Sequence, residues 1–175
     1  MDINFLIVAF YSYLLGSIPF GLIITKLFLR KDIREIGSGN IGATNVLRTG
    51  NKFLAIFTLI LDLLKGYLSI ILTLKYNDEL ILLSALFCLL GHVFSIWLKF
   101  KGGKGVATFV GILLAFSINY FLIFILIWIS ILLIFRYSSL SSIVATFSII
   151  IYEYFFMENN IVFFLFVSFI IILYA

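Results

Sequence analysis

Two glycine-rich stretches hold most of the residues in this sequence that could do chemistry. One is "GSGNIGATNVLR" at residues 37–48, and the other is "KGGKG" at residues 101–105. Glycine lets backbone N–H groups approach a bound oxyanion without a Cβ atom in the way. Lysine adds a point charge, and arginine adds a planar fork that matches two phosphate oxygens. Together with the hydroxyl-rich "RYSSLSS" at residues 136–142, these stretches indicate a site for a phosphate group.

The expected phosphate site is not of the nucleotide-binding kind. The stretch at residues 101–105 lacks the GxxxxGK[ST] spacing, and no strand precedes it for such a loop to follow. This argues against an ATPase. We also expect no nucleic-acid partner.

Ionisable residues also lie inside long apolar runs. Asp62 and Lys65 are three positions apart, so on a helix they share a face and can pair, which lowers the cost of placing each at membrane depth. This pair fits either a functional cavity or a purely structural ion pair. His92 lies roughly two helical turns or more before the second glycine stretch, where it could act as a base or orient a substrate. The single cysteine, Cys88, excludes an intramolecular disulfide and argues against a zinc site.

The composition shows that membrane helices must position these residues. Hydrophobic residues make up 64% of the 175 positions and charged residues 11%, with a mean hydropathy of +1.27, whereas soluble domains carry about 25% charge. A helix needs about 20 apolar residues to cross the hydrocarbon core. We therefore expect a single all-α polytopic membrane domain over residues 1–175 with about seven transmembrane helices. The expected spans are residues 4–25, 53–74, 80–98, 106–118, 119–135, 142–157 and 161–175.

Local signals refine these spans. The apolar run from 106 to 135 is too long for one ordinary span, so we split it at about Ser117 and Asn119. The first span begins with "MDIN" and has its cations on the far side, so it is expected to stay as a helix and not to be a cleaved signal peptide. Pro19 predicts an irregular backbone within this span, with a freed carbonyl group that neighbouring residues must satisfy.

The cations predict how the chain is oriented. Most follow the first, third and fifth spans, where they are Lys26, Arg30, Lys31, Arg34, Arg48, Lys52, Lys99, Lys101, Lys104 and Arg136. The opposite side carries Lys75 beside Asp78 and Glu79. Under the positive-inside rule, the amino terminus lies outside and all three unusual loops face the cytoplasm, which places the active site on that face.

As a set, these motifs resemble a known family. "GSGNIGATNVLR" at 37–48, "LLKG" preceded by Asp62, "GHVFSIWLKFKGGKGVAT" at 91–108 and "RYSSLSS" at 136–142 are similar to the successive motifs of the bacterial membrane-embedded acyl-phosphate:glycerol-3-phosphate acyltransferases, the PlsY family. The resemblance runs from about residue 16 to residue 143. It implies a seven-helix enzyme of the bacterial plasma membrane that transfers a fatty acyl group from acyl phosphate to the 1-hydroxyl of glycerol 3-phosphate, giving lysophosphatidic acid and phosphate. No metal or coenzyme is implied.

The resemblance also implies roles for individual residues. The motif that shapes the polar pocket is matched by Ser38, Gly39, Asn40, Thr44, Asn45 and Arg48. The phosphate-gripping loop is matched by Gly102, Gly103, Lys104 and Gly105, and His92 opens that motif. Asp62 and Lys65 match an intramembrane pair, and Ser141 and Ser142 match a hydroxyl pair. Lys104 and Arg48 are expected to neutralise the anionic substrates, and either His92 or the donor's own phosphate oxygen would take the hydroxyl proton. One departure is Ser95, which stands where the family usually has proline and predicts a less kinked helix end.

Two other classes of protein share some of these features. A small transporter or channel for an organic phosphate would also surround an anion with glycine-broken segments and cations. Against that alternative, the sequence has no internal repeat, and its polar loops fall on one membrane face. A scaffolding subunit would not need phosphate-type donors in three separate loops.

Overall fold

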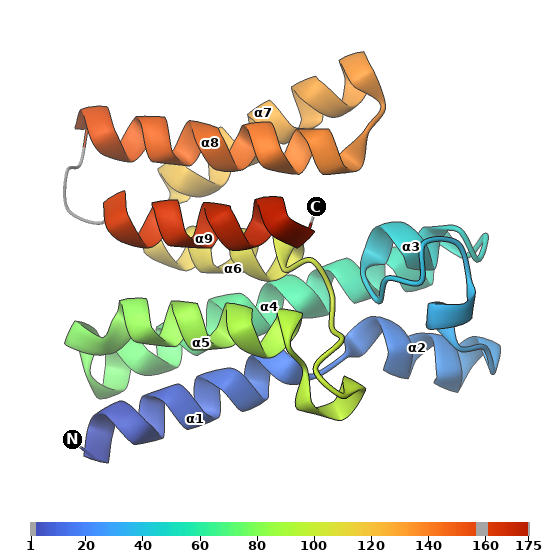
Figure 1. Ribbon diagram of the computed structural model, residues 1–175, viewed down its shortest axis with the longest axis horizontal. Coiled ribbons are helices and arrows are strands. Elements are labelled where there is room, and N and C mark those ends of the chain that lie inside the picture. The colour runs from blue at the N-terminus through green and yellow to red at the C-terminus, as the bar shows by residue number, and fades with distance from the viewer. Residues whose placement is uncertain (1–2, 157–160, 175) are drawn as a thin grey trace. The chain divides into compact units, whose positions relative to one another are not determined.

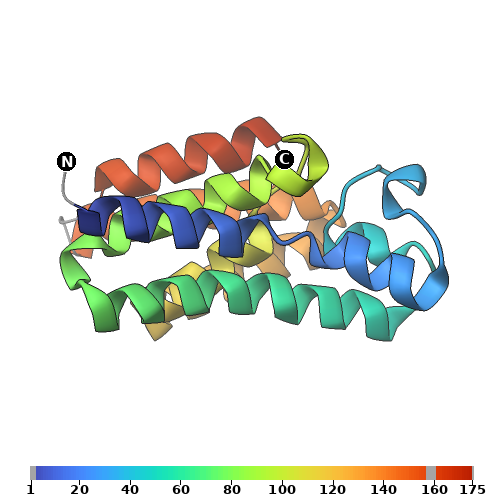
Figure 2. The same ribbon diagram turned by 90° about the horizontal axis from the view of Figure 1, so that it is seen from below.

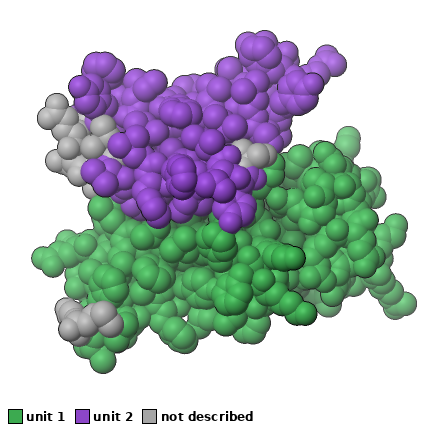
Figure 3. All heavy atoms as spheres, in the orientation of Figure 1, with its two compact units in different colours: residues 1–115 green, residues 116–175 purple. Residues whose placement is uncertain are grey.

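The computed structural model describes residues 3–156 and 161–174, and every regular element within those ranges is helical. The chain divides into two compact units, residues 1–115 and residues 116–175 (Figure 3). The prediction of an all-α fold is confirmed.

The first unit contains six α-helices and three short 3-10 helices among its described residues. In chain order they are α1 (Ile3–Ser17), α2 (Phe20–Leu29), η1 (Ile33–Glu35), α3 (Ala43–Leu47), α4 (Lys52–Tyr76), η2 (Asp78–Leu80), α5 (Ile81–Val93), η3 (Ile96–Leu98) and α6 (Val106–Phe116), whose last residue is the first of the second unit.

Helices α1 and α5 run side by side because small residues let their backbones meet (Figures 1 and 2). A Cβ atom added at Gly16 would overlap the Cys88 carbonyl, and one added at Gly91 would overlap the Tyr13 carbonyl. This is the small-residue packing that membrane helices use in place of a hydrophobic driving force. Ser12 Oγ lies 2.9 Å from Ser84 Oγ, and Ser95 Oγ donates to the Ser17 carbonyl at 2.6 Å, so residue numbers rise together along the contact. The two helices are therefore parallel, and the segments that follow them lie at the same end of the unit.

A break after α1 was expected from Pro19, and the structure shows it. Helix α1 ends at Ser17, and α2 starts at Phe20. The carbonyl oxygen of Ile18, exposed by the break, accepts a hydrogen bond from Lys65 Nζ at 2.9 Å. A side chain of α4 therefore satisfies the irregular backbone, as the proline predicted.

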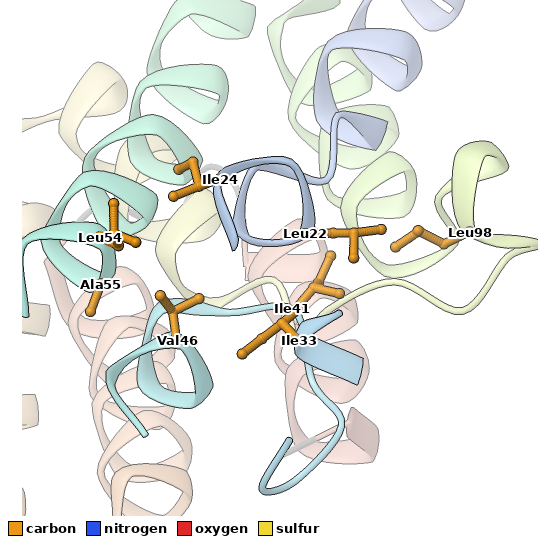
Figure 4. Packing of buried hydrophobic residues seen from close by; sticks show 8 residues of the cluster. All are labelled: Leu22, Ile24, Ile33, Ile41, Val46, Leu54, Ala55 and Leu98. Atoms are coloured by element: carbon orange, nitrogen blue, oxygen red, sulfur yellow. The ribbon is translucent and has the colours of Figure 1, made fainter. Parts of the chain in front are cut away.

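The end of the first unit that follows α2 and α5 is held together by an apolar cluster (Figure 4). It joins α2, η1, the 36–47 loop, the start of α4 and η3 through Leu22, Ile24, Ile33, Ile41, Val46, Leu54, Ala55 and Leu98. Ile33 and Val46 have no exposed surface. Burying a side chain of this size contributes about 1.5–3 kcal/mol to the stability of the folded protein. The cluster therefore holds the segments that lead into both glycine-rich loops next to each other.

The second unit is a helical hairpin with a third helix packed on it. It consists of α7 (Ile118–Phe135), α8 (Ser138–Phe156) and α9 (Ile161–Tyr174). The hydroxyl of Tyr120 on α7 donates to the buried carboxylate of Glu153 on α8, and Trp128 Nε1 donates to Ser142 Oγ at 3.2 Å. The residue numbers run in opposite directions along this contact, so α7 and α8 are antiparallel.

Five of the described helical segments are long and apolar enough to cross a membrane. They are Ile3–Leu29, Lys52–Tyr76, Asp78–Leu98, Ile118–Phe135 and Ser138–Phe156. The other two predicted spans are the shorter apolar helices Val106–Phe116 and Val162–Tyr174. At 1.5 Å per residue the first of these extends only about 16 Å, well short of the hydrocarbon core. These lengths and compositions are those expected of an integral membrane protein with several spans.

The predicted split of the 106–135 run is confirmed. Ser117 is extended, with φ −165° and ψ 139°, and its side chain accepts a hydrogen bond from the Asn119 amide to cap α7. Most helix bounds match the predicted ones to within a few residues. The exceptions are α2, which extends to Leu29, α5, which ends at Val93 before the separate η3, and α8, which begins at Ser138, four residues before the expected start at 142.

Candidate active site

The first glycine-rich loop is organised by one buried side chain, Asn45. Its Nδ2 group donates to the carbonyl oxygens of Ile33, Ile36 and Asn40 at 3.0, 2.9 and 2.7 Å. Its Oδ1 atom accepts from the Ser38 amide at 3.1 Å. Asn45 therefore fixes the path of the whole 33–45 segment, which a short polar side chain at the start of a helix is well suited to do.

The remaining residues of this loop lie nearer the surface. Asn40 Oδ1 accepts from the Gly42 amide at 3.0 Å, while Ser38, Thr44 and Arg48 are exposed. Gly37 and Gly39 have φ of +57° and +72°, which favours glycine. A Cβ atom at Gly37 would come within 2.6 Å of Arg48 Cδ, so the arginine side chain packs directly over this glycine.

An ion pair forms in the turn that precedes this loop. Arg34 Nε and Nη2 donate to the two carboxylate oxygens of Asp32 at 2.9 and 2.6 Å, and Lys26 Nζ lies 3.5 Å from the same carboxylate. The hydrogen bonds from Arg34 hold the pKa of the Asp32 carboxyl well below its usual range. Arg34 is therefore paired with Asp32, whereas Arg48 packs over Gly37.

The second glycine-rich loop folds back onto the end of α5. Lys99 and Phe100 both adopt left-handed backbone angles, with φ of 53° and 63°, and reverse the chain. The amides of Gly102 and Gly103 then donate to the carbonyl oxygens of Val93 and His92 at 2.9 and 3.0 Å. A Cβ atom at Gly102 would overlap the His92 carbonyl, and one at Gly103 would overlap His92 Nε2. Glycine is required here because the backbone lies against the imidazole.

Lys104 is the cation of this folded loop. Its side chain is half-buried, between the buried Gly103 and Gly105. Partial removal from water lowers the pKa of the Lys104 ammonium. A cation in such a setting interacts more strongly with an anion than a fully solvated lysine does.

Beneath the loop, four polar side chains from α4, α5 and α6 are buried together. Lys65 Nζ lies 2.9 Å from Asp62 Oδ1, with both side chains at most 3% exposed, so the predicted pair forms. His92 Nδ1 lies 3.8 Å from the same Asp62 oxygen and 3.2 Å from Thr108 Oγ1. Removing one partner of a buried ion pair typically costs about 3–5 kcal/mol, so this cluster is a firm support for the loop above it.

Sequence spacing placed His92 about two turns before the glycine loop, but the structure brings them into contact. Helix α5 ends at Val93, even though Ser95 replaces the proline usual in the family. Ser95 Oγ donates to the Ser17 carbonyl at 2.6 Å, so a hydrogen bond to α1 positions the chain where it leaves the helix.

Ser141 and Ser142 lie in the second unit, near the start of α8. Their hydroxyls donate to carbonyl oxygens of their own helix, Tyr137 O at 2.8 Å and Ser138 O at 2.9 Å. Within the first unit, by contrast, the structure joins His92, Asp62 and Lys65 to the 102–105 loop and links that loop through Leu98 to the base of the 37–48 loop.

The sequence reasoning missed Thr108 and the Asp32–Arg34 pair. Thr108 was visible as an isolated hydroxyl in the first turn after the glycine loop, and its contact with His92 follows from the loop folding back. Asp32 two residues before Arg34 was a local signal for a capped turn. Among the described residues, no group of three His, Cys, Asp or Glu side chains is arranged to hold a metal ion.

The fold and this site define a class of protein: an all-α integral membrane protein whose glycine loops and cations gather at one end of its first unit. The sequence profile named glycerol-3-phosphate acyltransferase matches residues 6–175. The glycerol-3-phosphate acyltransferase of Pelagibacter ubique is 57% identical over 175 residues, which cover 98% of this chain and 90% of that protein. The enzyme of the same name from Wolbachia pipientis wMel is 53% identical over 156 residues, covering 87% and 81%.

Solved structures give the same result. The crystal structure of PlsY (YgiH), an integral membrane glycerol 3-phosphate acyltransferase, in its glycerol 3-phosphate form is similar with a TM-score of 0.90 and 36% identity, covering 97% of this chain and 87% of that one. The lysophosphatidic acid form gives 0.87 at the same identity. The chain belongs to the glycerol-3-phosphate acyltransferase family of membrane enzymes. This decides against the transporter and scaffolding alternatives.

Proposed function

We propose that this acyltransferase moves a fatty acyl group from acyl phosphate to the 1-hydroxyl of glycerol 3-phosphate, giving lysophosphatidic acid and inorganic phosphate. The observation that carries the proposal is the glycine loop 102–105, which presents the half-buried Lys104 above a buried ion pair. The polar loop that ends at Arg48 shares the same apolar base. Two loops that carry cations and are held by the same apolar cluster suit a reaction in which both substrates carry phosphate.

The chemistry asks mainly for positioning. An acyl phosphate is an activated mixed anhydride, so attack by the substrate hydroxyl needs no enzyme nucleophile. The new ester C–O bond forms as the C–O bond to phosphate breaks, and the phosphate leaves with the electron pair. The hydroxyl proton passes to a phosphate oxygen of the donor or to His92. Holding two anions in reacting geometry is worth several kcal/mol only if their repulsion is offset.

We assign that offset to Lys104 and Arg48. Lys104 would neutralise one phosphate as a point charge, while the fork of Arg48 would hold two oxygens of the other. Fixed donors aimed at developing charge are usually the largest catalytic term in such a site. Asn45 would keep the 37–48 loop open around the substrate, with Ser38, Gly39, Asn40 and Thr44 lining it. The acyl chain would lie against the apolar spans.

We further propose that seven helices cross the membrane within one domain, with α6 and α9 as the short members. The family profile spans both compact units, which supports a single domain over residues 1–175. Most cations of the first unit lie at the end that bears the glycine loops, whereas Lys75 lies at the other end with Asp78 and Glu79. The positive-inside rule then supports an external amino terminus and a cytoplasmic active site.

The test of the function is product formation by the purified protein in liposomes. Given acyl phosphate and glycerol 3-phosphate, the protein should release lysophosphatidic acid and inorganic phosphate in equal amounts. Lysophosphatidic acid without phosphate release would contradict the proposed donor, and no product at all in correctly inserted protein would contradict the function.

A further inference from the structure

Residues 96–101, which connect the end of α5 to the glycine loop, present large apolar side chains outward. The fractional exposure is 64% for Trp97, 60% for Phe100 and 48% for Ile96. Ile96 and Trp97 belong to the short η3, at the very end of the candidate span Asp78–Leu98, and Phe100 follows that span. A cluster of exposed large apolar side chains on a short connecting segment marks a contact surface.

The backbone of this segment is firmly held. Trp97 Nε1 donates to Ser17 Oγ at 2.9 Å, and the Phe100 amide donates to the Ser95 carbonyl at 2.9 Å. Leu98, between the outward-facing residues, is buried in the apolar cluster of Figure 4. The outward positions of Trp97 and Phe100 are thus built into the fold. Because the only polar atom of the indole is satisfied by Ser17, the exposed part of the ring is hydrocarbon.

The position and charge of the segment identify what covers it. It directly follows α5, and the candidate membrane span that contains α5 ends at Leu98. The segment therefore lies where the chain leaves the hydrocarbon core. Lys99 and Lys101 alternate with the apolar residues and are exposed. Tryptophan rings at the membrane boundary with lysines reaching toward headgroups are the pattern of an interfacial anchor, and each such lysine near an anionic surface is worth about 1 kcal/mol.

We propose that residues 96–101 form an interfacial anchor, with Ile96, Trp97 and Phe100 inserted at the lipid boundary and Lys99 and Lys101 facing anionic headgroups. The glycine loop begins at the next residue, Gly102. The anchor therefore sets the depth of that loop at the headgroup level, where the phosphate of a membrane-borne acyl phosphate lies. The consequence for the donor rests on the proposed function, whereas the anchor itself does not.

Fluorescence can test this directly because the chain has two tryptophans, Trp97 and Trp128. In a Trp128→Phe variant reconstituted into vesicles of phosphatidylcholine and phosphatidylglycerol, Trp97 should emit to the blue of free tryptophan. Lipids brominated near the headgroup should quench it more than lipids brominated near the chain end, and aqueous iodide should quench it several-fold less than free tryptophan. A Trp97 readily quenched by iodide and untouched by brominated lipid would overturn the anchor.

A second position guards against a local distortion at Trp97. In a Trp97→Phe, Trp128→Phe, Phe100→Trp variant, the new indole should show the same headgroup-depth quenching, and iodide quenching there would also count against the anchor. The lysines predict stronger lipid quenching in vesicles with phosphatidylglycerol than in pure phosphatidylcholine. Equal quenching in both would contradict the headgroup contact of Lys99 and Lys101.

The quenching experiment and the acyl-transfer assay can fail independently of each other. Lipid quenching of Trp97 in a protein that makes no lysophosphatidic acid from acyl phosphate would support the anchor and contradict the function. Iodide quenching in a fully active protein would contradict the anchor alone.

Discussion

The amide of Gly103 donates to the carbonyl oxygen of His92 at 3.0 Å, and the imidazole of the same histidine fills the space that a side chain at Gly103 would need. This contact joins the phosphate-binding loop proposed above to the buried Asp62–Lys65 pair, since His92 Nδ1 lies 3.8 Å from Asp62. Substitutions at these two positions should therefore depend on each other.

We predict that Gly103→Ala strongly lowers turnover and that His92→Asn restores part of it. Asparagine places an amide near the position of Nδ1, which faces Thr108 and Asp62, but lacks the Nε2 edge that a Cβ atom at Gly103 would meet. Steady-state rates of the wild type, the two single variants and the double variant give the interaction energy between positions 92 and 103.

The single variant His92→Asn separates two roles for the histidine. If His92 acts by supporting the loop through Nδ1, its turnover and pH profile should stay close to those of the wild type. If His92 is the required base, His92→Asn should be inactive and the double variant should recover nothing. The matched control is His92→Gln. Because glutamine keeps an amide near the position of Nε2, this substitution should not restore turnover to Gly103→Ala.

Lys104→Gln should lose most turnover while the protein still inserts and purifies normally. Charge neutralisation of a phosphate in a partly water-excluded site is worth on the order of 100-fold in rate. The matched control is Lys52→Gln, because Lys52 lies at the same end of the first unit but is exposed. If Lys104 served only as a positive-inside signal, its neutral variant would remain near normal, since other lysines still mark that side.

The depressed pKa of Lys104 predicts an alkaline limit on activity. Burial disfavours the charged ammonium, so as pH rises Lys104 loses its proton earlier than an ordinary lysine, and acyl phosphate binding should weaken with it. Arginine stays charged at alkaline pH. The Lys104→Arg variant should therefore be less active because of its different shape, but its activity should not fall with rising pH in this way. The KM for acyl phosphate, measured from initial rates across alkaline pH, would check this. An identical alkaline loss of activity in the wild type and in Lys104→Arg would assign that loss to another group.

The orientation can be measured by thiol labelling in a Cys88→Ser background. Single cysteines at the exposed positions Lys52 and Lys101 should resist a membrane-impermeant reagent in intact cells and react in inverted vesicles, whereas a cysteine at Asp78 should react in intact cells. Gly102 would be a poor probe because a side chain there overlaps the His92 carbonyl. Labelling in the reverse pattern would contradict a cytoplasmic active site.

Much of this fold could be predicted because its signals are local. The length of the 106–135 run and its polar Ser117 gave the break before α7, and Pro19 gave the break after α1. The i,i+3 spacing of Asp62 and Lys65 gave their ion pair. Each of these depends on residues within a few positions of one another.

The rest depended on contacts across the chain. Lys65 reaches the Ile18 carbonyl, 47 positions away, and Asn45 gathers carbonyl oxygens back to Ile33. No spacing rule shows which backbone group a polar side chain will find. The contact between His92 and Gly103 was hidden because two non-glycine residues, Lys99 and Phe100, adopt left-handed angles and reverse the chain.

The most direct test of the account compares two acyl donors of the same chain length with the purified protein in liposomes. The glycine loop 102–105 and Lys104 are proposed to bind the leaving phosphate, and the sequence has no nucleotide-binding fingerprint. We predict rapid lysophosphatidic acid formation from acyl phosphate, matched by phosphate release, and little from acyl-coenzyme A. Comparable initial rates with both donors would contradict the proposed phosphate grip of Lys104 and its glycine loop.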